Sequence, residues 1–159
     1  MRIGVLSEPE EENRVAIVPN SVKKLTKVGF KVIFEKGAGI KANYLDKEYS
    51  DAGAILSSRS EVMSSDILIT INMLGKDDLR PGMILACVAD PFRHPEKIKN
   101  ALEKKITLFS MDMIPRRLSR AQSMDVNSSQ DNLAGYKAVL LGASYVPKGI
   151  PMMLSLIHI

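Results

Sequence analysis

The chain has no tryptophan and one cysteine, and it has neither a strong excess of one charge nor a long apolar run. The single cysteine, Cys87, excludes an internal disulfide and a cysteine-pair metal site, and no metal site is predicted. Because Cys87 lies in the apolar run 83–88, we expect a buried strand residue in a reducing compartment. No apolar run is long enough to span a bilayer, and the N-terminus lacks the apolar segment of a signal peptide. These absences predict a cytoplasmic location.

The composition is that of an ordinary globular domain. A chain of 159 residues can bury a sizeable core, and its 45% hydrophobic and 25% charged residues are typical values. The formal net charge is +4, and the basic residues are spread along the chain between acidic ones such as Glu8 and Glu10. This spread argues against a nucleic-acid partner.

Short apolar runs alternate with segments of helical pattern. The apolar runs are 3–6, 31–34, 54–56, 67–71, 83–88 and 106–109, and the helical segments between them are 19–28, 46–52, 59–63 and 95–104. The residues expected to face the sheet are Val22, Leu25 and Val28 in segment 19–28, and Ile98 and Leu102 in segment 95–104. This alternation predicts an α/β fold with a Rossmann-like parallel sheet covered by helices.

The pattern changes after residue 109, where a polar loop precedes one longer helix. We expect this linker helix to begin near Ser128, with Ser128 and Asp131 as its N-terminal cap. The predicted domains are therefore an α/β domain over 1–127 and a helix over 128–153. The last six residues, 154–159, match the translation of a transposase end sequence used as an adaptor in DNA library preparation. We expect them to be an artefactual tail, so that His158 carries no function.

A glycine pair after the second apolar run formally matches the dinucleotide fingerprint G-x-G-x-x-G/A. It reads Gly37-Ala-Gly39-Ile-Lys-Ala42. The fingerprint needs a helix that opens within the motif, so that its N-terminal amides face a pyrophosphate. Here Asn43-Tyr-Leu intervenes and the next helix starts near Asp46, so we expect a tight turn and no dinucleotide site.

The stretch 111–136 gathers arginines, an amide and a carboxylate between a predicted strand and a predicted helix, where α/β proteins place their chemistry. The candidates are Arg117, Gln122, Asp125 and Ser128. Gln122 can pair with a carboxamide, Arg117 can hold phosphate or carbonyl oxygens, and Asp125 can orient the arginine or accept from the amide. On the residues alone, a helix capping box from Ser119 to Gln122 and a solvated arginine cluster remain open.

The same stretch resembles the nicotinamide loop in the alpha subunits of proton-translocating NAD(P) transhydrogenases. The match is most specific over 119–136, which reads S-R-A-Q-S-M-D-V-N-S-S-Q-D-N-L-A-G-Y. The resemblance implies that Arg117, Gln122, Asp125 and Ser128 contact the nicotinamide of NAD(H). Because P-R-R-L-S at 115–119 is one residue longer than the family form P-R-I-S, Arg116 is the alternative loop arginine. Direct hydride transfer between two nicotinamides needs geometry and no general acid or base.

By this resemblance the complete subunit continues past residue 153 into a second, dinucleotide-binding domain that is missing from this chain. NAD(H) would lie between the two domains, and NADP(H) would be bound by a partner component, the beta subunit. A membrane component would couple hydride transfer to proton movement. The alpha subunit would be a homodimer peripheral to the inner (cytoplasmic) membrane, with methionines at 111, 113, 152 and 153 as candidate partner surface. The present chain would bind NAD(H) weakly and be inactive by itself.

Arg14 lies in N-R-V-A-I-V-P at 13–19, which resembles the R-V-A-x-x-P signature of transhydrogenase alpha subunits and alanine dehydrogenases. The resemblance favours a structural or anion-binding role for Arg14, and a solvated loop arginine is the alternative. A standalone α/β module that binds a small anion through Arg14 and Arg117 is therefore one alternative function.

An alanine dehydrogenase-like oxidoreductase is the other alternative. In those enzymes a lysine and a histidine bind and protonate the substrate, at places held here by Thr70 and by Ala89 or Asp90. Neither Ala89 nor Asp90 can act as a near-neutral acid, which argues against oxidative deamination. Thr70 also departs from many transhydrogenases, which keep the lysine. His94 follows a few residues later, and we expect it to be exposed.

Overall fold

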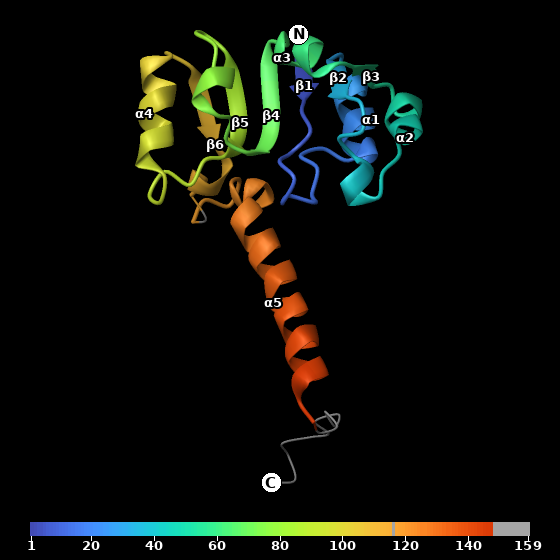
Figure 1. Cartoon of the computed structure of the whole chain (residues 1–159), viewed down its shortest axis with the longest axis vertical. Coiled ribbons are helices and arrows are strands. Elements are labelled where there is room, and N and C mark those ends of the chain that lie inside the picture. The colour runs from blue at the N-terminus through green and yellow to red at the C-terminus, as the bar shows by residue number, and fades with distance from the viewer. Residues whose placement is uncertain (116, 148–159) are drawn as a thin grey trace. The chain divides into compact units, whose positions relative to one another are not determined.

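In the computed structural model, which describes residues 1–115 and 117–147, six parallel strands form one sheet (Figure 1). The strands are β1 (Arg2–Val5), β2 (Lys31–Glu35), β3 (Ile55–Ser57), β4 (Ile67–Asn72), β5 (Ile84–Val88) and β6 (Thr107–Ser110). Their order is β3-β2-β1-β4-β5-β6, so the chain builds outward from β1 in one direction and then from β4 in the other. This confirms the predicted Rossmann-like parallel sheet.

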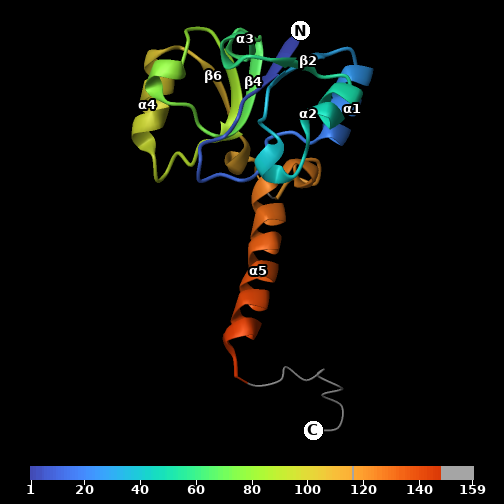
Figure 2. The ribbon, with the colours of Figure 1, turned by 45° about the vertical axis from the view of Figure 1, so that its right-hand side comes forward.

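Helices cover both faces of the sheet. They are α1 (Pro19–Lys27), α2 (Asp46–Asp51), α3 (Arg59–Met63) and α4 (Pro95–Glu103). Strand β2 shows the two-sided burial, because Val32 and Phe34 pack in one core with α1 and α2, whereas Ile33 packs in the other core with α3 and α4. Figure 2 shows α1 and α2 side by side.

Two predicted core residues are exposed instead. Val28 is the C-cap of α1 and is 76% exposed, because the helix ends at Lys27 and Gly29, with φ of +100°, turns the chain away. In α4 the buried position is Ala101, three residues after Ile98, and Leu102 is 77% exposed. Leu102 lies about 100° further round the helix than Ala101, so it points away from the sheet.

The glycine pair forms a turn, as predicted. Gly37 has φ of +81°, and the amide of Ala38 donates to the carbonyl of Glu35. A single 3₁₀ turn follows at Ile40–Ala42, and α2 begins at Asp46. A Cβ atom at Gly39 would lie 2.4 Å from Cε2 of Tyr49, so this glycine allows close packing on a core tyrosine.

The chain divides into two compact units, Met1–Ile114 and Pro115–Ile159. The second contains a 3₁₀ turn, Gln122–Met124, and helix α5 (Val126–Tyr145). The predicted cap of this helix is wrong, because Asp125 is the N-cap and its side chain accepts from the amide of Ser128. Of the predicted helix 128–153 and tail 154–159, the residues from 148 onward lie outside the described range.

Helix α5 carries large apolar side chains that are exposed within its own unit, among them Leu133, Tyr136, Leu140 and Tyr145. None of the helices in the described ranges is long and apolar enough to cross a membrane.

Candidate functional site

The site lies where β1 and β4 end next to each other, at the point where the strand order reverses. In open parallel sheets, ligands bind in the crevice outside the carboxyl ends of such a strand pair. A hollow of about 310 Å³ opens there. It is lined by Ser7, Glu8, Pro9, Arg59, Thr70, Asn72, Met73, Leu74, Gly75 and Asp78. A second hollow shares Pro9, Asn72 and Met73 with it and is also lined by Glu11, Glu12 and Lys97.

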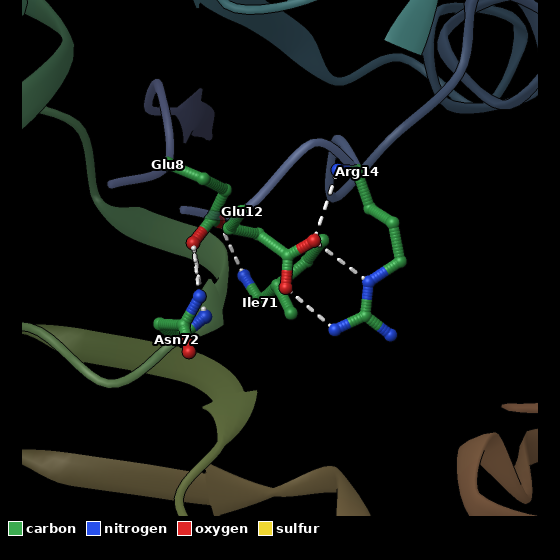
Figure 3. A network of polar contacts seen from close by, with 5 residues as sticks. All are labelled: Glu8, Glu12, Arg14, Ile71 and Asn72. Atoms are coloured by element: carbon green, nitrogen blue, oxygen red, sulfur yellow. Dashed lines mark hydrogen bonds and ion pairs between the residues drawn. The ribbon is translucent and has the colours of Figure 1, made fainter. Parts of the chain in front are cut away.

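Glu8 joins the two strand ends. It is 8% exposed, and its carboxylate accepts hydrogen bonds from the end of β4 (Figure 3). Oε1 accepts from the amide of Ile71 at 2.5 Å, and Oε2 accepts from the amide and Nδ2 of Asn72 at 3.1 and 3.0 Å. The pairing of β4 with β5 shifts register between Ile69 and Asn72. The carboxylate therefore satisfies amides at the irregular end of this strand.

Arg14 and Glu12 form a two-point pair on the loop after β1 (Figure 3). Nε of Arg14 donates to Oε1 of Glu12 at 2.9 Å, and a terminal guanidinium nitrogen donates to Oε2 at 2.6 Å. The Arg14 guanidinium is the main reason that the pKa of Glu12 lies below its usual value, and in turn Glu12 raises the pKa of Arg14. The structure thus holds Arg14 in a partly exposed position, paired with Glu12, which lines the second hollow.

Arg59, from the start of α3, also lines the hollow. Its guanidinium lies 3.4 Å from Oε2 of Glu35 and 3.5 Å from Oδ2 of Asp78. Glu35 also accepts from the amide of Ser7 at 2.7 Å. Thr70 is buried, and its hydroxyl donates to the carbonyl of Asn72 at 2.7 Å. The proton of this hydroxyl is therefore already used in a hydrogen bond to the main chain.

The end of β5 is fixed by a carboxylate from further along the chain. Oδ1 of Asp112 accepts from the amide of Ala89 at 3.2 Å, and Oδ2 accepts from the amide of Asp90 at 3.1 Å. Asp90 has a left-handed backbone, with φ of +46°. His94 is the N-cap residue of α4 and is exposed, as predicted, with Nδ1 3.3 Å from a carboxylate oxygen of Glu96.

In the second unit the four loop candidates fall into two groups. Asp125 and Ser128 are in direct contact, because Oδ1 of Asp125 accepts from the Ser128 amide at 3.0 Å and Oδ2 accepts from the Ser128 hydroxyl at 2.5 Å. The side chains of Arg117 and Gln122 are exposed and make no hydrogen bond or ion pair within residues 117–147. Ser119 to Gln122 is not a capping box, because α5 begins later and is capped by Asp125. Arg116 lies outside the described residues.

Glu8 and Asp112 were not among the predicted site residues. Glu8 had a usable signal, since it follows a buried strand directly at the carboxyl end of the sheet. Asp112 follows β6 in the same way and so carried the same signal, but the sequence does not reveal its partners, which lie 22 and 23 residues earlier. Within residues 1–115 and 117–147, no three side chains of histidine, cysteine, aspartate or glutamate gather closely enough to hold a metal ion.

The fold and the crevice define an α/β domain of the Rossmann-like class, and comparison with known proteins narrows this further. The family model for the alanine dehydrogenase/PNT N-terminal domain matches residues 4–134. The chain belongs to this family. NAD(P) transhydrogenase subunit alpha from Haemophilus influenzae is 38% identical over 147 residues, which cover 90% of this chain and 28% of that subunit. In Rhodospirillum rubrum, the polypeptide that forms the first part of NAD(P) transhydrogenase subunit alpha is 38% identical over 98% of this chain and 43% of its own length.

Solved structures agree with the sequence comparison. A transhydrogenase from Sinorhizobium meliloti superposes with a TM-score of 0.89 at 35% identity, covering 98% of this chain and 48% of its own. An L-alanine dehydrogenase gives a TM-score of 0.70 at 25% identity, over 76% of this chain and 34% of its own. The predicted resemblance to transhydrogenase alpha subunits is thereby confirmed. The chain spans less than half the length of these relatives.

Proposed function

We propose that this chain is the N-terminal portion of the alpha subunit of a proton-translocating NAD(P) transhydrogenase. In the complete subunit it forms one wall of the NAD(H) site, and hydride passes directly between NAD(H) and NADP(H). NADP(H) is held by a beta subunit, and a membrane component couples the transfer to proton movement. The alpha subunit acts as a homodimer at the cytoplasmic face of the membrane. By itself the chain binds NAD(H) weakly and is inactive.

The observation that carries this proposal is the chemistry at the strand ends. Thr70 is tied to the carbonyl of Asn72, and the amides of Ala89 and Asp90 are tied to Asp112. Thr70, Ala89 and Asp90 stand where alanine dehydrogenases have the lysine and histidine that bind and protonate a substrate, and the missing histidine is what separates the chain from those enzymes. Hydride transfer between two nicotinamides needs neither, because the hydride leaves one ring as it joins the other.

The loop supplies groups suited to holding a nicotinamide. The carboxamide of Gln122 can donate to and accept from the nicotinamide carboxamide, and Arg117 can hold a phosphate or carbonyl oxygen. Both side chains are exposed, which leaves them available to a ligand. Asp125 and Ser128 would contact the ring from the first turn of α5, or would hold that turn in place through their mutual hydrogen bonds.

The proposal can be tested in a chimera. Residues 1–147 of this chain would replace the matching region of the Rhodospirillum rubrum alpha polypeptide, and the product would be combined with that organism's partner subunits. We expect hydride transfer from NADPH to an NAD⁺ analogue, measured by absorbance. Gln122→Ala should lower kcat by about 100-fold, the cost of misplacing a reacting ring by roughly 1 Å. Asn20→Ala, an exposed change on α1, is the control and should leave kcat unchanged.

Two other results would favour the alternatives. NADH oxidation by the chimera that requires pyruvate and ammonium would indicate an alanine dehydrogenase-like enzyme. Tight binding of nucleotide or inorganic phosphate by the purified chain, lost in Arg14→Gln and Arg117→Gln, would indicate a standalone anion-binding module. Calorimetry on the 159-residue chain provides this second measurement.

A further inference from the structure

We propose that Asp112 is a positioning residue, which holds the start of the loop that carries Arg117 and Gln122 against the end of β5. This inference rests on the proposed function, because it assigns Asp112 a role in hydride transfer through the loop. Asp112 lies in a 3₁₀ turn, Met111–Met113, directly after β6.

The Asp112 carboxylate ties three segments together. It accepts from the amides of Ala89 and Asp90, which follow β5, at 3.2 and 3.1 Å. It also accepts from the hydroxyl of Ser110, the last residue of β6, at 2.6 Å. Since Cys87 of β5 pairs with Ser110, these contacts extend the β5–β6 ladder beyond its last strand pair. A charged acceptor makes such hydrogen bonds stronger than a neutral one.

The backbone around Asp90 explains why a carboxylate is needed there. Asp90 adopts φ of +46°, which costs energy for any residue other than glycine. The two successive amides of Ala89 and Asp90 both donate to the Asp112 carboxylate, an arrangement that binds anions. Ala89 is 2% exposed, so its amide would be poorly solvated without Asp112. Asp112 thereby stabilises a strained turn and is fixed by that turn in return.

The consequence for the loop follows from chain length. Arg117 is five residues after Asp112, so even a fully extended chain keeps it within about 18 Å of the anchored turn. Pro115 restricts this short span further, because its φ is locked and the residue before it is confined to extended conformations. The other end of the loop is held by the Asp125 cap of α5. We infer that the loop is anchored at both ends by aspartates.

The test compares Asp112→Asn with Asp66→Asn. Asp66 is a matched control, because its carboxylate also accepts from a main-chain amide, that of Arg2 at 2.7 Å, at the start of β1. The first readout is the rate at which trypsin cuts the full 159-residue chain after Arg117 or Arg120, followed by mass spectrometry. We expect Asp112→Asn to be cut about tenfold faster than Asp66→Asn, the factor that losing one charge-assisted hydrogen bond predicts.

The second readout is hydride transfer by the chimera described above. Asp112→Asn should lower kcat by about tenfold and leave the KM for NADPH unchanged, because misorientation of the loop affects the transition state and not binding to the partner. Asp66→Asn should change neither value. A merely structural role for Asp112 would lower the folded fraction of Asp112→Asn, measured by circular dichroism, and would leave kcat per folded molecule unchanged.

The outcomes distinguish this inference from the proposed function. Equal cleavage rates in the two variants, or faster cleavage with unchanged kcat, would overturn the positioning role while the transhydrogenase proposal stands. If the unmodified chimera transfers no hydride, the proposed function fails, and the role of Asp112 in that reaction fails with it. The cleavage rates then still decide whether Asp112 anchors the loop.

Discussion

Glu8 and Asn72 connect the ends of two neighbouring strands, because Oε2 of Glu8 accepts from both the amide and the side-chain nitrogen of Asn72, at 3.1 and 3.0 Å. The two residues are 64 positions apart, and the contact lies where the strand order reverses. A buried carboxylate with three hydrogen bonds is stabilising in place and costly to remove. The crevice is therefore shaped by an interaction that also holds the fold together.

Glu8→Ala should destabilise the chain by about 2–4 kcal/mol, because three donors lose a charged acceptor. Urea unfolding followed by circular dichroism gives the free energy of unfolding. Glu11→Ala is the control, since Glu11 lies on the same loop but is exposed, and it should change stability by less than about 0.5 kcal/mol. Equal effects of the two substitutions would show that the Glu8 contacts do not hold the strand ends together.

Gly39→Ala should destabilise the chain by about 1–3 kcal/mol through overpacking. The new Cβ would lie 2.4 Å from Cε2 of Tyr49 and 3.0 Å from the carbonyl oxygen of Tyr44. Gly75→Ala is the matched control, because no atom lies within 4 Å of its Cβ position. It should be neutral or slightly stabilising. If Gly39→Ala leaves the temperature of thermal unfolding unchanged, close packing against Tyr49 is not the reason for a glycine at this position.

The parallel sheet was predictable because its strands are buried on both faces. Continuous apolar runs such as 31–34 are typical of such strands, and the helices between them are short and clearly ended. Helix ends were less predictable. Val28 and Leu102 each continue an apolar stripe in the sequence. Whether such a residue is buried depends on where the helix ends and on which side of the helix packs against the sheet. The N-cap of α5 was predicted at the wrong residue, because Ser128 and Asp125 both fit a local capping pattern.

The candidate site could be predicted only where residues that are close together in the sequence form it. Gln122 and Arg117 were found from a short loop pattern, and their role in hydride transfer stays a prediction. Glu8 bonds to residues 63 and 64 positions away, and Asp112 bonds to residues 22 and 23 positions away. No local pattern contains such a pair, because the parallel sheet brings these residues together only after folding.

Tyr49 and Cys87 should make the chain sensitive to alkaline pH. Burial raises the pKa of the Tyr49 phenol to about 12, with smaller contributions from Tyr44 and nearby carboxylates. Burial likewise raises the pKa of the Cys87 thiol to about 12. Because both folded-state values lie above the unfolded ones, the stabilisation is complete below the unfolded pKa and is lost as pH rises toward the folded pKa. We therefore expect stability to fall between about pH 9 and pH 12.

Tyr49→Phe separates the contribution of Tyr49 to the pH dependence of stability from that of Cys87. The Tyr49 hydroxyl donates to the carbonyl of Ile17 at 3.0 Å, so the substitution should cost about 1 kcal/mol at pH 8. Above pH 10 the loss of stability with pH should be less steep in Tyr49→Phe than in the unmodified chain, because one titrating group is gone. Urea unfolding at a series of pH values measures both effects. Parallel curves for the two proteins would show that Tyr49 does not titrate with a raised pKa.

Asp125 can act as a helix cap or as a ligand for the nicotinamide, and two substitutions separate these roles. Asparagine caps a helix about as well as aspartate, whereas alanine does not. Asp125→Ala should therefore destabilise α5 by about 1 kcal/mol, and Asp125→Asn should leave it unchanged. Circular dichroism of the 159-residue chain measures the helix content. If Asp125 acts only through its contacts with Ser128, the chimera with Asp125→Asn should keep its full rate of hydride transfer. A large fall in kcat in that variant, with helix content intact, would instead show that the negative charge itself acts on the nicotinamide or on a loop arginine.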